Sequence, residues 1–162
     1  MLSNEGKLDP RVIRTRKLLM ESFLQLQYEK DFNDITIQDI ADRATVNRAT
    51  FYAHFQDKYA LLDNIIHDGF QITLQKRLCE PSNSPQAYLR QLFLAVTDHL
   101  GDIQSRCQRS LRTFGSLVEA QIKAQLREAL LSYFASEATL RAVPKPRQEL
   151  VATMISWSIY GA

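Results

Sequence analysis

The sequence of 162 residues predicts an all-α fold, and three observations support this prediction. Apolar residues recur at spacings of three and four along most of the chain, which is the period of an amphipathic helix. Pairs of residues that cap and open helices, such as Asp9-Pro10 and Ser84-Pro85, precede these stretches. No segment alternates apolar and polar residues over the length of a useful strand. We expect a small helical domain at residues 1–57 and a larger helical domain at residues 58–162.

The first helix is predicted to begin at Pro10, because Asp9 can cap it and proline suits the first helical position. The basic side chains Arg14, Arg16 and Lys17 are expected on its outer face. Its apolar residues recur at helical spacing and should pack on the rest of the small domain. These apolar positions are Ile13, Leu19, Met20, Phe23, Leu24 and Leu26.

Two short helices follow, and the residues that start them are well marked. Thr36 can cap a helix, with Asp39 three positions later as in a capping box. Asn47 can cap a second helix, eleven residues after the first cap. Only one short helix fits between the two caps, at about 37–43, followed by a turn at 44–46. The sequence therefore predicts a helix-turn-helix.

The second of these two helices is polar and carries no acid. From Ala44 to Gln56 there is no aspartate or glutamate, whereas Asn, Arg, Thr, Tyr and His are present. Such side chains hydrogen-bond base edges in the major groove of DNA and the flanking phosphates. On composition alone, a solvated helix face around a core tyrosine fits the pattern equally well.

The stretch TIQDIADRATVNRATFYAHFQDK at residues 36–58, followed by Tyr59-Ala60-Leu61-Leu62, resembles a known family. It is similar to the N-terminal domain of the tetracycline-repressor (TetR) family of bacterial transcription regulators. The resemblance covers about residues 13–66. One departure is Ala44, where the family usually has glycine in the turn; alanine is tolerated there if its φ stays negative.

The resemblance implies a homodimeric transcription regulator, most often a repressor, that leaves its palindromic operator when a small molecule occupies the C-terminal domain. It implies base or nearby backbone contacts for Gln38, Asn47, Arg48, Ala49 and Thr50, and phosphate contacts for Thr36, Tyr52, His54 and Lys58. We expect Arg48 to read sequence directly, because its guanidinium can pair with guanine O6 and N7. For the basic start of the first helix, a phosphate contact and a solvated face fit equally well.

The helices of the larger domain are predicted from their caps and breakers. Asp57 can cap a fourth helix, and Ser84-Pro85 opens a fifth, which Gly101 is expected to end. A sixth helix should be closed by Gly115, and Ser116-x-x-Glu119 has the pattern of a capping box for a seventh. The predicted ranges are 58–78, about 85–100, about 102–113, a seventh helix to about 140, a proline-broken turn at 141–147, and an eighth helix from near 146.

Charge and cysteine usage restrict the cellular setting. The chain has 20 basic and 18 acidic side chains, so net charge alone does not indicate a nucleic-acid partner. No signal peptide or membrane span is visible, and the protein is expected in the cytoplasm without a membrane partner. The two cysteines, Cys79 and Cys107, lie far apart without metal-ligand spacing, which favours inert thiols in a reducing compartment.

No catalytic signature follows the fourth helix. His67 and His99 are isolated, with no triad partner or metal-ligand spacing, so we expect neither an enzyme nor a cofactor. Aromatic residues of the larger domain either line an effector cavity or fill the core, and the sequence does not choose between these roles. An alternative function is a co-regulator whose C-terminal domain binds a partner protein rather than a small molecule; an enzyme with a borrowed DNA-binding domain is the weakest alternative.

The end of the chain is apolar. From Gln148 a predicted helix runs to Ala162 with almost no charge after Glu149. Chains that resemble this one usually continue into a further helix, and the last two helices pack against their copies in the partner subunit. We therefore expect either a natural chain longer than 162 residues or a terminal helix exposed enough to bind a partner.

Overall fold

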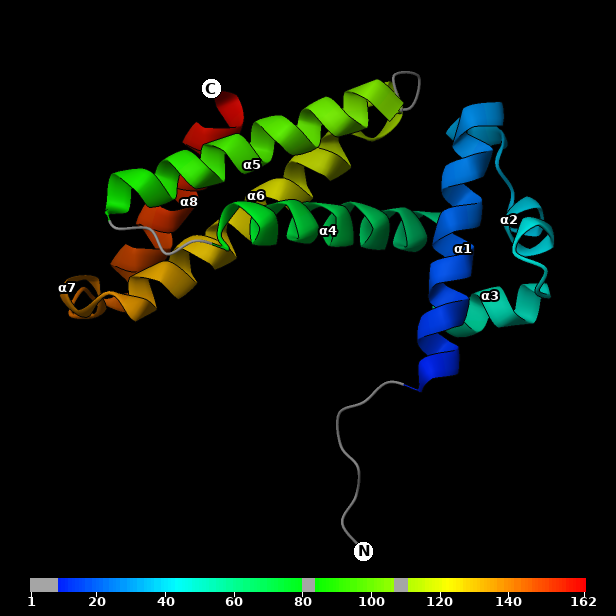
Figure 1. Cartoon of the computed structure of the whole chain (residues 1–162), viewed down its shortest axis with the longest axis horizontal. Helices are drawn as coiled ribbons and strands as arrows, with labels where there is room; N and C mark the ends of the chain where they lie inside the picture. Colours follow the sequence, from blue (N-terminus) through cyan, green and yellow to red (C-terminus); the bar gives the residue numbers. More distant parts are fainter. Residues whose placement is uncertain (1–8, 80–83, 107–110) are drawn as a thin grey trace, which may run out of the picture. The chain divides into compact units, whose positions relative to one another are not determined.

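The computed structural model describes residues 9–79, 84–106 and 111–162, and within these ranges it is helical with no strand (Figure 1). The predicted all-α fold is therefore confirmed. The chain divides into two compact units, Met1–Leu62 and Asp63–Ala162, which we call the head and the body. The division falls inside helix α4 (Lys58–Arg77).

The helices of the head begin where their caps predict. Oδ1 of Asp9 accepts a hydrogen bond of 2.9 Å from the backbone N–H of Arg11, and Pro10 occupies the first helical position. Both short helices of the predicted helix-turn-helix are present with the expected caps. The head consists of α1 (Pro10–Glu29), the 3-10 turn η1 (Phe32–Asp34), α2 (Ile37–Arg43), α3 (Arg48–His54) and the start of α4.

Apolar side chains from each of these elements meet in one core. Phe32 of η1 lies at its centre, with the rings of Phe23 and Tyr59 edge-on at centroid distances of 6.0 and 5.0 Å. Full burial of each large apolar side chain contributes about 1.5–3 kcal/mol. Ile13, which was expected to pack, is 52% exposed in the first turn of α1. The buried set includes Leu19, Phe23, Leu26, Phe32, Ile35, Ile40, Phe51, Phe55 and Leu61.

The body is a layered arrangement of longer helices. It contains the rest of α4, α5 (Pro85–Arg106), α6 (Leu111–Ser136), the short α7 (Ala138–Arg141) and α8 (Lys145–Gly161). α8 packs along α6, and α5 contacts both (Figure 1). No helix in the described part of the chain has the length and apolarity needed to cross a membrane. The core of the body includes Leu92, Ala95, Val96, Val118, Ile122, Leu126, Leu130, Phe134 and Ala152.

Of two glycines predicted to end helices, Gly101 does not do so, whereas the helical path is interrupted next to Gly115. α5 continues through Gly101 to Arg106, and Gly115 lies inside α6. A glycine costs a helix about 1 kcal/mol relative to alanine, which the burial of neighbouring apolar residues can offset. The predicted break at Gly115 corresponds to a kink in α6 at the adjacent Phe114, whose φ and ψ are −125° and 18°. Part of the predicted sixth helix, together with Cys107, lies outside the described residues.

The predicted capping box at Ser116 is also wrong, because this residue is inside α6. The carboxylate of Glu119 pairs with the ammonium of Lys123 one turn later in the same helix. α6 ends at Ser136, earlier than predicted, and the chain forms α7 before the proline-containing turn. α8 starts at Lys145, which agrees with the start predicted near Pro146.

Candidate nucleic-acid interface

The start of α2 is held by a complete capping box. Oγ1 of Thr36 accepts from the backbone N–H of Asp39 at 3.1 Å, and Oδ2 of Asp39 accepts from the backbone N–H of Thr36 at 2.8 Å. The ammonium of Lys30 lies 2.8 Å from the other carboxylate oxygen of Asp39. This ammonium, followed by the hydrogen bonds from Thr36, holds the pKa of Asp39 well below its ordinary value. The first residue of the predicted DNA-contact set is thus fixed in place.

The turn between α2 and α3 closes with a Schellman motif. The N–H of Thr45 donates to the carbonyl of Asp42 at 3.1 Å, and the N–H of Val46 donates to the carbonyl of Ala41 at 2.9 Å. Ala44 has a φ of −78°, so the absence of glycine at this position causes no strain. The left-handed residue is Thr45, with a φ of 57°. A β-branched residue in this conformation is unfavourable, and no sequence signal predicted it.

α3 is capped by a side chain at its beginning and by one from α1 at its end. Oδ1 of Asn47 accepts from the backbone N–H of Thr50 at 2.8 Å. At the other end, Nη1 of Arg16 donates to the carbonyl of His54 at 3.3 Å, and the guanidinium lies 4.6 Å from the centroid of the Phe55 ring. Arg16 was expected on the outer face of α1. It instead covers the C-terminus of α3, where its charge complements the helix dipole.

The face of α3 opposite the buried Phe51 is open to solvent. Arg48 and Tyr52 are exposed, and Nη2 of the arginine is 3.5 Å from the tyrosine hydroxyl, a distance at the limit of a hydrogen bond. Within the described residues of α3 there is no acid, so the exposed charge of this helix is positive. A concave surface lies between α2 and α3, and the hollow has a volume of about 740 Å³. It is lined by Gln38, Asp42, Thr45, Val46, Asn47, Arg48 and Ala49.

The residues predicted to contact DNA differ in how free their polar groups are. Thr36, Gln38, Asn47, Arg48, Ala49 and Tyr52 are exposed, and Thr50, His54 and Lys58 are half-buried. Gln38 donates to Oδ1 of Asp42 at 2.6 Å, so its amide must leave this partner before it can reach a base. Four residues of the set, Gln38, Asn47, Arg48 and Ala49, line the concave surface.

Lys58 has an internal role that sequence reasoning missed. Its ammonium lies 2.9, 3.2 and 2.9 Å from the carbonyl oxygens of Phe32, Asn33 and Ile35, and 4.5 Å from the centroid of the Phe32 ring. This arrangement ties the first turn of α4 to the segment that leads into α2. A lysine whose ammonium contacts carbonyls of a distant turn has no distinctive sequence pattern, so only the fold brings these groups together.

A further ion pair joins α1 to α2. The guanidinium of Arg43 donates to both carboxylate oxygens of Glu29, at 2.8 and 2.7 Å. This pairing lowers the pKa of Glu29, first through the hydrogen bond from Arg43. Within the described part of the chain, no group of His, Cys, Asp and Glu side chains is arranged to hold a metal ion. Ion pairs, caps and the buried core thus hold the helices of the head together, and α3 presents a polar face without acids.

Comparison with known proteins identifies similar sequences for the head. Residues 20–65 match the family described as bacterial regulatory proteins, tetR family. A segment of 63 residues, 38% of this chain, is 44% identical to the uncharacterized HTH-type transcriptional regulator YxbF of Bacillus subtilis (strain 168) and covers 17% of that protein.

Two relatives have names that state a direction of regulation. The HTH-type transcriptional repressor DhaR of Mycobacterium sp. (strain GP1) is 30% identical over 88 residues, which is 52% of this chain and 44% of that protein. The HTH-type dhaKLM operon transcriptional activator DhaS of Lactococcus lactis subsp. lactis (strain IL1403) is 33% identical over 58 residues, 36% of this chain and 31% of that protein. The matched segments thus span less than half the length of these relatives.

Proposed function

Residues 20–65 belong to the TetR family of bacterial transcription regulators, and on this premise we propose that the protein is a ligand-responsive repressor that binds a palindromic operator as a homodimer. The family consists of transcription regulators and not of enzymes. The observation that carries the proposal is the exposed, acid-free face of α3, which is backed by capped ends and a buried core. A recognition helix of this kind enters the major groove of DNA.

The proposed DNA-binding residues make two kinds of contact, to bases and to phosphates. Asn47, Arg48, Ala49 and Thr50 begin α3 and face base edges or the adjacent backbone, with Gln38 as an additional base contact. Thr36, Tyr52 and His54 hold phosphates, and Lys58 joins them if its ammonium leaves the three carbonyl oxygens that it contacts in the head. Phosphate contacts fix the position of the helix, whereas base contacts give specificity. Among them Arg48 is best suited to direct readout, because its guanidinium has a single weak partner and can reorient toward guanine.

Repression is favoured over activation because the relative named as a repressor matches a larger share of this chain than the relative named as an activator does. The named repressor matches 52% of this chain, against 36% for the named activator. An effector is supported by the body, which contains cavities of about 410 and 510 Å³. Such a ligand changes operator binding only if it binds one state of the dimer better than the other.

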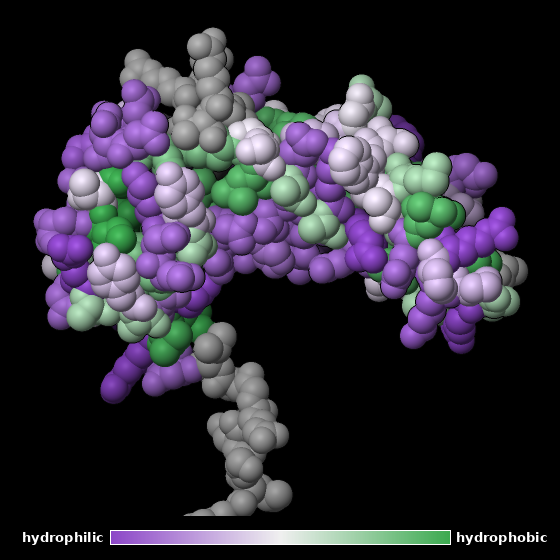
Figure 2. Space-filling model, turned by 180° about the vertical axis from the view of Figure 1, so that it is seen from behind, coloured by the Kyte–Doolittle hydropathy of each residue, from purple (hydrophilic) through white to green (hydrophobic). Residues whose placement is uncertain are grey.

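A homodimer is supported by the outer face of α8. Its large apolar side chains Leu150, Met154 and Trp157 are 61%, 61% and 62% exposed. In Figure 2, green hydrophobic residues interrupt the purple hydrophilic surface on the face shown. Apolar side chains at this spacing on one helix are suited to packing against a second copy. A dimer presents two heads, and each α3 then meets one half-site of a palindrome.

Selection of random DNA duplexes by the purified chain tests the proposal. We expect enrichment of an inverted repeat whose half-sites are about 34–36 Å, or one helical turn, apart. Repeating the selection with a metabolite extract should reduce recovery of the same sequences if an effector releases the protein. Recovery of no preferred sequence, together with stable co-purification of another protein, would instead identify a co-regulator that acts through protein contacts.

A further inference from the structure

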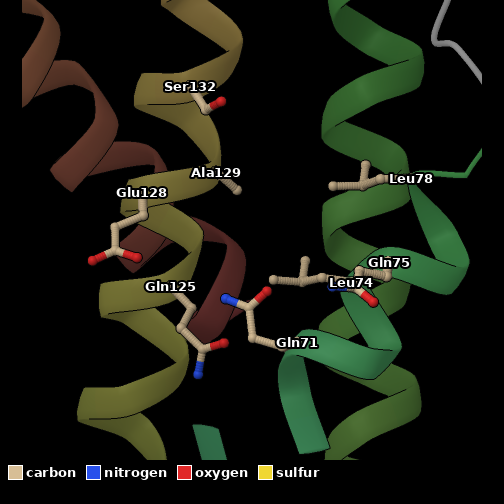
Figure 3. Close-up of a pocket in the computed structure, with 8 residues that line it drawn as sticks. All are labelled: Gln71, Leu74, Gln75, Leu78, Gln125, Glu128, Ala129 and Ser132. Carbon is tan, nitrogen blue, oxygen red and sulfur yellow. The ribbon is translucent and has the colours of Figure 1, made fainter. Parts of the chain in front are cut away.

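A cavity of about 410 Å³ lies between α4 and α6 in the body (Figure 3). Gln121 of α6 donates a hydrogen bond to Asp63 of α4, and farther along both helices the cavity separates them. The lining comes from one face of each helix: Gln71, Leu74, Gln75 and Leu78 of α4, and Gln125, Glu128, Ala129 and Ser132 of α6. The volume is within the range of small-molecule sites.

Gln125 is the unusual residue of this lining. It is 2% exposed, and neither Nε2 nor Oε1 of its side chain has a hydrogen-bond partner. Buried amide groups are almost always paired, because an unpaired one lowers stability. The neighbouring positions Leu126 and Leu130 of α6 are buried leucines, and a leucine at position 125 would suit the fold better. The amide is therefore better explained by something that enters the cavity.

The other lining residues limit the charge of that molecule. No lysine, arginine or histidine lines the cavity, so an anion has no positively charged partner there. The only ionised lining residue is Glu128, whose side chain extends away from α4 in Figure 3. Leu74 and Leu78 extend toward α6 in the same view and provide apolar contact. The lining thus combines the amides of Gln71, Gln75 and Gln125 and the hydroxyl of Ser132 with an apolar wall and no positive charge. Of the three amides, that of Gln125 is the one buried without a hydrogen-bond partner.

We infer that this cavity binds a neutral or cationic small molecule with an amide or lactam group, which donates to Oε1 of Gln125 and accepts from its Nε2. An amide or lactam has a donor and an acceptor side by side, as the glutamine side chain does, so the two groups can form a pair of hydrogen bonds. The inference rests on the proposed function, because it states the chemical class of the effector.

The second cavity of the body has the opposite character. It encloses about 510 Å³, and Tyr88 and Tyr133 stack in its wall at a centroid distance of 4.1 Å. Two of its polar side chains are already paired: Tyr88 donates to the carbonyl of Ala129 at 3.0 Å, and the amide of Gln148 donates to two carbonyl oxygens at 2.9 and 2.8 Å. Arg147 lines it and would attract an anion. An aromatic carboxylate should therefore prefer this second cavity.

Nuclear magnetic resonance of the isotope-labelled chain tests the inference with defined probes. We would titrate ε-caprolactam as the amide probe and benzoate as the anionic probe. The side-chain amide signals of Gln125 are assigned by their loss in Gln125→Leu. The lactam should shift these signals in a saturable way, and benzoate should leave them unchanged. Gln104→Leu, the same change at an exposed position of α5, should bind the lactam like the unaltered chain.

The thermal stability of the variants supplies a second, ligand-free readout. Gln125→Leu should raise Tm, because it removes an unpaired buried amide, and it should abolish the lactam-induced shifts. Gln104→Leu should change Tm little. A lower Tm for Gln125→Leu would mean that the amide is satisfied in the fold, and a lactam that shifts only Tyr133 and its neighbours would place the ligand in the other cavity. Either result, or the absence of any saturable shift at Gln125, overturns the inference.

Operator binding is measured separately on the same preparations. If the chain selects a palindrome but the lactam does not reach Gln125, the inference about the ligand fails and the proposed function stands. If the lactam binds at Gln125 but no DNA sequence is selected, the proposed function fails and the cavity remains a binding site for amides.

Discussion

At the scale of single residues, Arg48 and Lys58 are both cationic members of the proposed DNA-binding set, but their surroundings differ. Arg48 is exposed and weakly held, whereas the ammonium of Lys58 contacts three carbonyl oxygens inside the head. The sequence pattern assigned both to DNA, because a motif records which residue type occurs and not which groups it already binds. The consequences of removing each charge should therefore differ.

Arg48→Ala should relax base preference at one position of each half-site, at a cost of about 1–3 kcal/mol for the preferred operator. The reason is that only the guanidinium can pair with guanine O6 and N7. Affinities for operators altered one base at a time provide the measurement. Arg14→Ala, which removes an exposed charge from α1, is the matched control and should leave base preference unchanged. A uniform loss for every operator in Arg48→Ala would assign the arginine to phosphate.

Lys58→Met should destabilise the head by about 1.5–3 kcal/mol, the range for hydrogen bonds of charged groups. Methionine keeps the aliphatic stem but leaves the carbonyl groups of η1 without the ammonium. Chemical denaturation measures the free energy of unfolding, with Lys17→Met at an exposed position of α1 as the control. If Lys58 also binds phosphate, the salt dependence of operator affinity should fall by about one unit. An unchanged stability would remove the structural role that we assign to this lysine.

His99 connects stability to pH. It is 6% exposed, its ring centroid is 5.3 Å from that of Phe70, and its Nε2 has no hydrogen-bond partner. A Cβ added at Gly69 would lie 3.2 Å from its Cε1, so the glycine leaves room for the ring. Burial lowers the pKa of His99, and the charge of Asp102 opposes this only in part. The folded body therefore binds fewer protons here than the unfolded chain does.

Stability should accordingly decrease as pH falls below the unfolded pKa of about 6.5 and toward the lower folded value. Above that unfolded value the contribution of His99 is fully present. Denaturant unfolding at several pH values between about pH 8 and pH 5 measures this change in the free energy of unfolding. His99→Leu should flatten the dependence, while His67→Leu, at a more exposed site, should preserve it. An equally steep curve for His99→Leu would show that other groups cause the loss.

At the scale of elements, the turn of the helix-turn-helix separates what the sequence could predict from what it could not. Caps at Thr36 and Asn47 are local signals, because a side chain binds a backbone group within three residues, and both were predicted correctly. The left-handed residue of the turn is a threonine, a type that gives no such signal. Conversely, Gly101 signalled a helix end but lies inside α5, whereas the signal at Gly115 corresponds to the kink at Phe114 of α6.

The turn yields a paired prediction. Thr45→Gly removes strain of about 1–2 kcal/mol, partly offset by the greater entropy of glycine in the unfolded chain, and should raise Tm. Ala44→Gly, at a residue with negative φ, has only the entropic cost of about 0.5–1 kcal/mol and should lower Tm. Differential scanning calorimetry of the two variants tests this contrast. If glycine stabilised position 44 and not position 45, our assignment of the strained residue would be wrong.

At the scale of the whole molecule, the sequence predicted the all-α class and the first three helices correctly, because caps and helical period are local signals. The boundary placed after residue 57 marks the end of the predicted DNA-binding motif, whereas compactness divides the chain after Leu62, inside α4. Which cavity binds an effector could not be predicted. The aromatic residues considered for that role are distributed between core, second cavity and exposed surface, and Gln125 gives no signal until its burial is known.

The proposed homodimer makes a prediction at this scale. Sedimentation of the chain at micromolar concentration should show dimers or larger species, because association covers the apolar face of α8. Replacing Met154 and Trp157 together by glutamate should yield monomers and weaken binding to a palindrome more than to a single half-site. Glu149→Lys, an exposed charge change on the same helix, is the control for charge alone. A monomer that binds a palindrome tightly, with no dimer forming on the DNA, would contradict both the interface and the two-headed arrangement.

The contact between Arg16 and α3 has a consequence for how operator specificity can evolve. α3 has only seven residues, fewer than an isolated helix needs to be stable in water. Its persistence depends on the buried Phe51 and Phe55 and on an arginine that is 38 positions away from the carbonyl it binds. All of these supports act on the inner face and the end of the helix. The outward positions Arg48 and Ala49 can therefore change by mutation, and acquire new operators, without loss of the folded head.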